Sequence, residues 1–372
     1  MVYYENMIKC YIFEKTKKDS YMKKLFLFIG IVTLIGSCKK ENNNNGVGGN
    51  LVYITNDITV PTTWYADSIY IINDHDFWVE NTLTIQPGTI IKFTSNYHMV
   101  VDKSGTVMAQ GTAEKPIVFT SIKDDSYGGD CNKDGAASQP SPGDWQNISV
   151  TSNGNIFSYC KFMYGGGSSY FSTLEITGGN ATITHCTFTK NKGGKAGSIY
   201  YGALDAGNAG DQTLIQHNVF YNNNLPLSLS SVISLDNTNL FHDPANAAAG
   251  NTMNGIFIYD IDEIRKAVSW EETEVPFVIN DVDLWIESPG SLTLAPNVIV
   301  KFTPESRLVI GTGATLSYNA TNYFTSFKDD SHGGDTNGDG NTTHPSDGDW
   351  LGIWDDATST YLSAAGILYD NN

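Results

Sequence analysis

Two stretches of the sequence concentrate the oxygen ligands that a hard metal cation prefers. Residues 123–145 (loop 1) read KDDSYGGDCNKDGAASQPSPGDW, and residues 328–350 (loop 2) read KDDSHGGDTNGDGNTTHPSDGDW. Each loop contains the pattern Asp-x-Asn-x-Asp-Gly, in which alternate carboxylate and amide oxygens precede a glycine that permits a sharp bend. Because an EF-hand-type calcium loop opens in the same way, the pattern predicts one structural calcium ion, Ca2+, in each loop.

The predicted calcium ligands occupy equivalent positions in the two loops. They are Asp130, Asn132, Asp134 and Asp144 in loop 1, and Asp335, Asn337, Asp339 and Asp349 in loop 2. The position at which an EF-hand loop carries a bidentate glutamate is Ser141 in loop 1 and Ser346 in loop 2. The missing oxygens must therefore come from the aspartate that follows this serine, or from the paired aspartates at the start of each loop.

The loops also admit a second interpretation, in which Asx and glycine turns form without any ion. Two features favour the ion. The five aspartates of loop 1 repel one another unless a cation neutralises them. The loops contain almost no aliphatic residue that would anchor them to a core, so we expect them to become ordered only when calcium binds.

The two loops belong to a longer internal repeat. Residues 119–145 and 324–350 are identical at 18 of 27 positions without a gap. Further matches upstream of both loops extend the repeat towards the N-terminus. The sequence therefore predicts a first repeat unit over residues 51–255 and a second, incomplete unit over residues 256–372.

Short segments in each unit alternate apolar and polar residues and end at glycine, proline or asparagine, as β-strands do. The pattern apolar-x-x-small-x-apolar recurs at residues 157–162, 183–188, 215–220 and 362–367. A stack of parallel coils requires such recurrence, because each coil places the same inward positions over the coil below. The sequence predicts an all-β solenoid, and residues 262–272 are the best candidate for a single helix or turn.

Three segments resemble a known family. They are residues 60–93, residues 110–121, and the beginning of loop 1 together with its closing Gly-Asp-Trp. These segments are similar to right-handed parallel β-helix repeat proteins of the pectate-lyase-like fold, which are found as surface lipoproteins of Gram-negative bacteria. The resemblance spans nearly all of residues 51–372 and implies an all-β, right-handed parallel β-helix. It implies no particular activity, because this fold carries lyases, hydrolases and adhesins.

The N-terminal region has the features of a secretion signal. Residues 22–38 read MKKLFLFIGIVTLIGSC, with two lysines, an apolar run that is short for a membrane span, and small residues before Cys38. The ending resembles the lipobox of bacterial lipoproteins, which implies lipidation of Cys38 after cleavage. We predict an upstream extension and signal peptide at residues 1–37, a flexible tether at residues 38–50, and a lipid anchor in the outer membrane that faces the cell exterior.

The composition narrows the possible partners. The formal net charge is −18 and the chain has only two arginines, so we expect no nucleic-acid partner. Beyond the signal segment lie Cys131, Cys160 and Cys186, an odd and sparse set that does not make a disulfide framework. Cys160 and Cys186 share a repeat position and are expected to be buried thiols, and His185 and His217 are expected to stack.

The tryptophans and charged residues bear on activity. Six of the seven tryptophans recur across the repeat units, which predicts roles in packing or loop anchoring, whereas Trp354 has no counterpart and is a candidate for ligand contact. No catalytic residue is assigned, because neither a base beside a calcium ligand nor a carboxylate pair across a groove is recognisable.

The predicted function is adhesion or glycan binding without catalysis, with the glycan or protein ligand unknown. The alternatives are a polysaccharide lyase or glycosidase of this fold, and a passive stalk.

Overall fold

The computed structural model describes residues 40–41, 49–73, 76–95, 97–167, 172–258 and 262–371. The predicted signal peptide and Cys38 lie outside these residues. Every regular element in the described part of the chain is a β-strand, as the sequence predicts. No helix there is long and apolar enough to cross a membrane.

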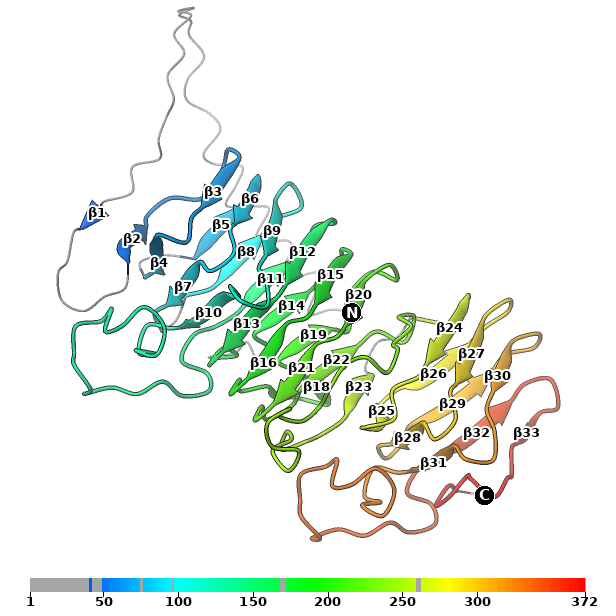
Figure 1. Cartoon of the computed structure of the whole chain (residues 1–372). Coiled ribbons are helices and arrows are strands. Elements are labelled where there is room, and N and C mark those ends of the chain that lie inside the picture. The colour runs from blue at the N-terminus through cyan, green and yellow to red at the C-terminus, as the bar shows by residue number, and fades with distance from the viewer. Residues whose placement is uncertain are drawn as a thin grey trace, which may run out of the picture. The chain divides into compact units, whose positions relative to one another are not determined.

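Three large sheets form sides of the coils (Figure 1). The eight-stranded sheet contains β1 (Lys40–Glu41), β2 (Asn50–Ile54), β4 (Ser68–Ile72), β7 (Ile90–Phe93), β10 (Ile117–Ser121), β13 (Cys160–Met163), β16 (Thr187–Thr189) and β21 (Val219–Tyr221). The ten-stranded sheet contains β5 (Phe77–Val79), β8 (Met99–Val101), β11 (Ile148–Val150), β14 (Leu174–Ile176), β19 (Leu204–Ala206), β22 (Leu227–Leu229), β23 (Ile256–Ile258), β25 (Phe277–Ile279), β28 (Ile299–Phe302) and β31 (Tyr323–Ser326). The six-stranded sheet contains β3 (Thr62–Trp64), β6 (Thr82–Ile85), β9 (Thr106–Gln110), β12 (Asn155–Ser158), β15 (Ala181–Thr184) and β20 (Leu214–Gln216).

Two smaller sheets and a hairpin complete the strands. The three-stranded sheet contains β24 (Ala267–Trp270), β27 (Ser291–Leu294) and β30 (Thr315–Ser317). The four-stranded sheet contains β26 (Asp283–Ile286), β29 (Arg307–Ile310), β32 (Gly352–Asp355) and β33 (Thr360–Tyr361). The hairpin consists of β17 (Gly194–Ala196) and β18 (Ile199–Tyr201). Among these strands, pairing is parallel except between β1 and β2, β17 and β18, and β32 and β33.

The chain visits the sides of the stack in a fixed order. Strands β3, β4 and β5 belong to the six-, eight- and ten-stranded sheets, and β6, β7 and β8 repeat that order directly above them. Connections between parallel strands of one sheet take a right-handed sense. The fold is therefore a right-handed parallel β-helix, which confirms the fold class predicted from the sequence.

Equivalent strands of the two repeat units lie on different sides of the stack. Strands β25, β28 and β31 are the sequence counterparts of β4, β7 and β10, but they extend the ten-stranded sheet instead of the eight-stranded one. The eight-stranded side ends with a bridge between Val219 and Leu240, and the four-stranded side begins with a bridge between Ile264 and Ile286. Between the two units, equivalent strands are therefore displaced by one side of the coil.

Inward-facing side chains stack from coil to coil. The longest aromatic stack contains Phe119, Phe162, Phe188, Phe220 and Phe241, which are fully buried. Neighbouring rings in it are nearly parallel, with centroids between 4.7 and 5.3 Å apart. The middle three come from the recurring segments noted in the sequence, so the prediction that these segments lie over one another is confirmed.

One segment differs from the sequence prediction. Residues 262–272, the candidate for a helix or turn, contain strand β24. Val268 and Trp270 are buried in this strand whereas Ala267 and Ser269 are not, which is the period of a half-buried strand rather than of a helix. Within the segment predicted to be a flexible tether, β1 pairs antiparallel with β2.

The C-terminal segment continues the coil only in part. Ile367 pairs with Phe324 as Phe162 pairs with Phe119, so the predicted register is confirmed at this point. The preceding strand β33 instead turns back against β32 and leaves β30 at the edge of its sheet. Leu362 and Ile367 pack against the core.

Candidate metal centre

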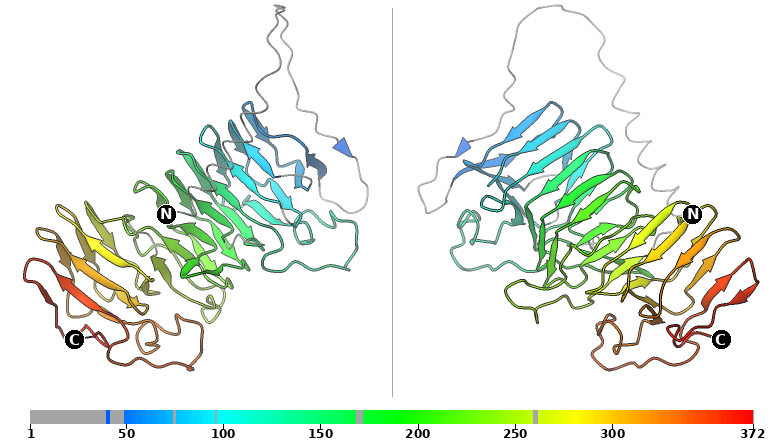
Figure 2. Two further views of the ribbon diagram at one scale, coloured as in Figure 1. Left: turned by 180° about the vertical axis from the view of Figure 1, so that it is seen from behind. Right: turned by 45° about the vertical axis from the view of Figure 1, so that its right-hand side comes forward.

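The two acidic loops connect consecutive strands on different sides of the coils. Loop 1 joins β10 to β11, and loop 2 joins β31 to β32. Both loops project from the stacked strands (Figures 1 and 2). Because the second unit is displaced by one side, loop 1 leaves the eight-stranded sheet and loop 2 leaves the ten-stranded sheet. Different strands therefore underlie nearly the same loop sequence.

A tryptophan anchors the end of each loop to the core. Trp145 and Trp350 are buried, and they stack on Phe93 and Phe302 with ring centroids 4.2 and 3.9 Å apart. Each indole Nε1–H donates to a main-chain carbonyl oxygen of the next coil, at 2.8 and 2.9 Å. The predicted anchoring role is confirmed for these two tryptophans.

The carboxylates of Asp144 and Asp349 close the base of each loop. Asp144 accepts hydrogen bonds from Lys123 Nζ at 2.8 Å and Ser121 Oγ at 2.9 Å. Asp349 accepts the equivalent bonds at 2.7 and 2.6 Å. Burial alone would raise the pKa of Asp349, but hydrogen bonds from the lysine and the serine hold it below its ordinary value. The structure does not bring either aspartate together with the other predicted ligands: Asp349 is not part of the carboxylate cluster of loop 2 described below, and Asp144 belongs to no such cluster among the described residues.

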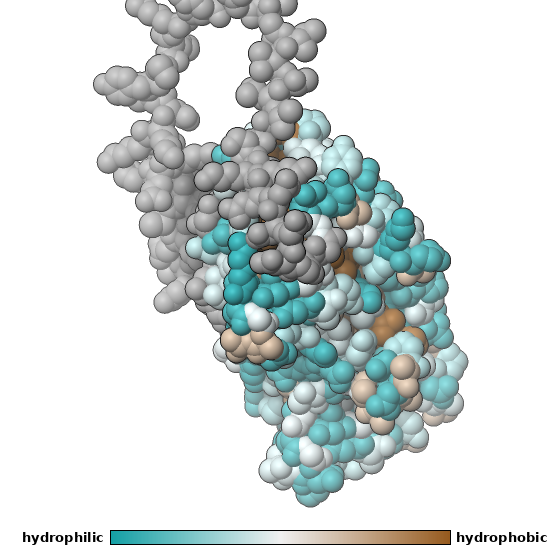
Figure 3. All heavy atoms as spheres, turned by 60° about the vertical axis from the view of Figure 1, so that its left-hand side comes forward, coloured by the Kyte–Doolittle hydropathy of each residue, from teal (hydrophilic) through white to brown (hydrophobic). Residues whose placement is uncertain are grey.

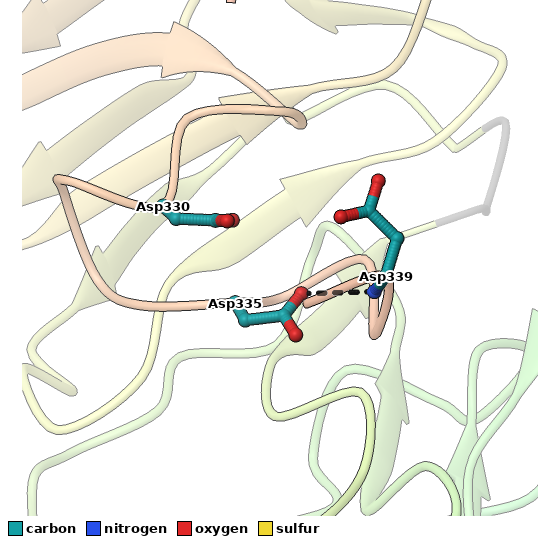
Figure 4. A group of neighbouring side chains, drawn as sticks. All are labelled: Asp330, Asp335 and Asp339. Atoms are coloured by element: carbon teal, nitrogen blue, oxygen red, sulfur yellow. Dashed lines mark hydrogen bonds between the residues drawn. The ribbon is translucent and has the colours of Figure 1, made fainter. Parts of the chain in front are cut away.

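Three carboxylates converge in loop 2 (Figure 4). Oxygen atoms of Asp330, Asp335 and Asp339 all lie within 4.8 Å of one another. The main-chain N–H groups of Asp339 and Gly340 donate to the two oxygens of Asp335, at 3.1 and 2.8 Å. This Asx turn points the Asp335 carboxylate inward. Asn337 donates Nδ2–H to Asp339 Oδ2 at 3.0 Å, which ties the third predicted ligand to the same group.

The surroundings of Asp330 disfavour its ionisation, whereas hydrogen bonds, first the one from Thr343, lower the pKa of Asp339. Burial, followed by the charge of Asp335, raises the pKa of Asp330. The buried Oδ1 of Asp330 has no hydrogen-bond partner in the described structure. A hard cation among the three carboxylates would coordinate this oxygen and cancel the repulsion, and Ca2+ prefers such oxygen ligands. The residues present therefore fit a calcium ion.

Loop 1 has the same turn but a less complete cluster. Main-chain N–H groups of Asp134 and Gly135 donate to the two oxygens of Asp130 at 3.2 and 2.8 Å. The Oδ1 atom of Asn132 is buried without a hydrogen-bond partner in the described structure, and burial followed by Asp130 raises the pKa of Asp125. However, in the described part of the chain only loop 2 brings three carboxylates within 4.8 Å of one another.

Sequence reasoning missed a buried lysine beneath each loop. Lys92 and Lys301 are fully buried, although they lie on the outward-facing side of β7 and β28. Lys92 Nζ donates to the carbonyl oxygens of Asp124 and Gly129, both at 2.9 Å. Lys301 Nζ makes the equivalent contacts with a carbonyl oxygen at 2.7 Å and a threonine hydroxyl at 2.9 Å. The only sequence signal was a lysine recurring at one position of both apolar strands.

Burial disfavours the charged form of Lys301. It lowers the pKa of Lys301 to about 8, against the opposing effect of Asp329, Asp330 and Asp335. The ammonium group therefore places one positive charge under the carboxylates of loop 2. This single positive charge neutralises only part of the negative charge of the carboxylates. A bound cation could neutralise the remainder.

Loop 1 also has an apolar anchor. Cys131 is 4% exposed and packs with Leu51, Ile69 and Ile71 on the outer face of the eight-stranded sheet. The expectation that neither loop is anchored by apolar contacts is therefore wrong for loop 1. The equivalent residue of loop 2 is Thr336, whose hydroxyl accepts from the buried lysine.

Trp354, the candidate for ligand contact, is partly exposed on β32. Its ring packs edge-to-face against Tyr361 with centroids 4.9 Å apart, and its Nε1–H donates to Asp356 at 2.6 Å. Trp285 faces outward from β26 of the same sheet, with the buried Val309 between the two tryptophans. Aromatic side chains thus gather on the outer face of the four-stranded sheet.

The predictions for the histidines and cysteines are confirmed. His185 and His217 stack with ring centroids 4.8 Å apart. Cys160 and Cys186 are buried free thiols, and Cys131 is also free. The tryptophan pair Trp64 and Trp270 is buried, as expected for packing residues, whereas the second recurring pair, Trp78 and Trp285, is only half-buried.

The fold and the two loops define a right-handed parallel β-helix with acidic insertions. A family model described as a pectate-lyase-like β-helix domain matches residues 56–150. That stretch includes loop 1 and ends with β11. Comparison of the chain with curated proteins and with solved structures gives no match.

Proposed function

We propose that this chain is an extracellular β-helix protein that binds calcium structurally in its acidic loops and uses its outer surface for adhesion or glycan binding without catalysis. The observation that carries the calcium part is the convergence of Asp330, Asp335 and Asp339, together with the orphaned Asp330 oxygen. Calcium would hold these carboxylates together and fix the loop above the buried lysine. The proposed role of the ion is therefore structural: it would stabilise loop 2 and would take no part in catalysis.

The aromatic face of the four-stranded sheet supports a glycan as the ligand. Trp285, Trp354 and Tyr361 offer partly exposed rings, and Asp283 and Arg307 beside them form an ion pair of 2.7 Å. Sugar rings stack their apolar faces on such aromatics, while charged groups at the edge bind hydroxyls. The face of the molecule seen in Figure 3 is mostly hydrophilic, with small, separate apolar patches.

A glycan array combined with assays for lyase products and reducing sugars tests this function on the chain without residues 1–37. The proposal expects binding without turnover, and loss of binding in Trp354→Ala. Tyr318→Ala is the matched control, because Tyr318 is an exposed aromatic on a different part of the second unit. Product formation would favour a polysaccharide-active enzyme, and silence in every assay would favour a passive stalk.

We further propose that the protein is anchored to the outer membrane by a lipid on Cys38 and faces the cell exterior. The support is the short apolar run and the lipobox-like ending of residues 22–38. Replacing Cys38 by Ser should release the protein from the membrane fraction. Normal membrane anchoring of that variant would refute the lipid anchor while leaving the calcium and glycan proposals intact.

A further inference from the structure

A second acidic site lies on the outer face of the ten-stranded sheet, outside the residues of both loops. Glu175 on β14 and Asp205 on β19 are paired in register on adjacent parallel strands. Neighbouring strands of a sheet are about 4.8 Å apart, so the two carboxylates lie side by side. Asp205 is 2% exposed, although an aspartate normally faces water.

Polar side chains surround this pair and orient it. Ser172 Oγ donates to Asp205 Oδ2 at 3.4 Å, and the main-chain N–H of Gly207 donates to Asp205 Oδ1 at 2.9 Å. Asn147, at the start of β11, donates Nδ2–H to Glu175 Oε2 at 3.0 Å. These contacts leave the two carboxylates in fixed positions rather than free to separate.

Asn147 provides an independent sign of a missing ligand. The residue is fully buried, yet its Oδ1 atom has no hydrogen-bond partner in the described structure. Its amide nitrogen bonds Glu175, so the orphaned oxygen of the same amide lies beside the pair. Leaving a buried acceptor unsatisfied costs about 1–3 kcal/mol. Three oxygen-bearing side chains thus meet where at least one of them lacks a partner.

The buried carboxylate of Asp205 and the half-buried carboxylate of Glu175, side by side, do not both stay ionised without a compensating positive charge. The neighbouring charge that acts on Glu175 is that of Asp205, which has the same sign, and after burial it raises the pKa of Glu175 to about 7. A proton shared by the pair would remove one charge, but it would not satisfy Asn147 Oδ1. A metal cation would do both.

We propose that Glu175, Asp205 and Asn147 Oδ1 form a third calcium site, which is built on the strands of the first repeat unit and is independent of the acidic loops. Hard oxygen donors of two carboxylates and one amide are ligands that Ca2+ uses, with water completing its coordination. Such an ion would join β11, β14 and β19 across three coils.

The test uses a chain that carries Asp134→Ala and Asp339→Ala, so that the loops no longer contribute. Isothermal titration with calcium at mildly alkaline pH should still show one bound equivalent. Adding Glu175→Gln should weaken that binding at least about tenfold, which corresponds to about 1.4 kcal/mol. Adding Asn147→Asp should strengthen it, because a third carboxylate replaces the neutral amide.

Glu272→Gln is the control, since Glu272 is a buried glutamate whose pKa burial raises to about 7 and whose Oε2 also lacks a hydrogen-bond partner in the described structure, but it follows β24 of the three-stranded sheet and belongs to no strand of the proposed site. It should leave calcium binding unchanged in the same background. Circular dichroism melts establish that each variant is folded. If the loop-disabled chain binds no calcium, or if Glu175→Gln has no effect, the pair holds a proton and the site does not exist. Neither result depends on whether the loops bind calcium.

Discussion

Loops 1 and 2 have nearly the same sequence and the same Asx turn, yet only loop 2 brings three carboxylates together. Loop 1 has five aspartates and two lysines, whereas loop 2 has six aspartates and one lysine. The local pattern fixes the turn in both cases, because main-chain N–H groups hold the first aspartate. Whether a further carboxylate meets the turn depends on what supports the loop from below.

The supports of the two loops differ in chemistry. In loop 1, Cys131 is buried among aliphatic side chains. In loop 2, Thr336 bonds the buried lysine, and His332 replaces Tyr127 and lies with Nδ1 2.7 Å from Asp329 Oδ2. Both loops are anchored by a stacked tryptophan, but loop 1 has a further apolar contact at Cys131 where loop 2 has a polar contact at Thr336. We therefore expect loop 2, which has fewer apolar contacts, to depend more on a bound ion for its stability.

The buried lysines are the feature that the loops share, and their loss should have the largest effect. Lys301→Met keeps the apolar stem but removes the ammonium that binds a carbonyl and a hydroxyl. We expect a loss of unfolding free energy of about 3–5 kcal/mol, because buried polar partners are left uncompensated. Lys92→Met should cost a similar amount. Denaturant melts measure both.

Lys266→Met is the control for the lysine variants. Lys266 pairs with Asp211 at 2.6 Å, but both side chains are more than a third exposed, so the expected loss is within about 1 kcal/mol. If Lys301→Met behaves like this control, the buried ammonium does not support the loop. If Lys92→Met and Lys301→Met differ greatly in their loss of unfolding free energy, the buried lysines do not support the two loops in the same way.

Calcium should separate the two loops. Binding to the folded chain adds about 2.7 kcal/mol of stability per site at a hundredfold excess over the dissociation constant. Because loop 2 has the convergent carboxylates, Asp339→Ala should remove most of the calcium-dependent shift in melting temperature at low calcium, and Asp134→Ala should remove less. Melting each variant with calcium and with a chelator measures the difference. Equal losses would show that the convergence in loop 2 has no bearing on affinity.

One exchange between the loops should sharpen this difference. Lys133 of loop 1 has a φ of 61°, and the equivalent Gly338 has a φ of 71°, a left-handed conformation that glycine adopts without strain. Lys133→Gly therefore relieves strain and removes a positive charge close to the predicted ligands. We expect calcium to bind loop 1 several-fold more tightly, by about 1 kcal/mol. Gly338→Lys should weaken loop 2 by a similar amount. Calcium titration of Lys133→Gly and Gly338→Lys measures both changes in affinity. Unchanged affinities would show that this position does not cause the difference between the loops.

Much of the fold was predictable from the sequence, because a solenoid repeats its inward positions and the phenylalanine stack recurs visibly. The displacement of the second unit by one side was not predictable, since β4 and β25 have similar sequences and only their partners differ. The turn around Asp130 and Asp335 was predictable from local spacing. The roles of Lys92 and Lys301 were not, because a lysine in an apolar strand gives no sign of what covers it.

The smallest expected effect is that of Asp330 on the unfolding free energy, and its sign should differ with and without calcium. The pKa of Asp330 is raised above its ordinary value of 3.8, first by burial and then by Asp335, so the folded chain binds this proton more tightly than the unfolded chain. The stabilisation by that proton is fully present below the ordinary pKa and is lost as the pH rises through the raised one. At neutral pH and without calcium, ionised Asp330 therefore destabilises the fold slightly.

Asp330→Asn removes this charge, and it should raise the stability of the chelator-treated chain at neutral pH by less than about 1 kcal/mol. With calcium the same variant should be the less stable one, because it lacks a ligand. Asp347→Asn, an exposed aspartate of loop 2 outside the cluster, should change neither condition. Thermal melts across neutral and acidic pH, with calcium and with chelator, measure the crossover. If Asp330→Asn stabilises the chain equally in both conditions, Asp330 is not a calcium ligand, and the difference between the two loops is one of charge alone.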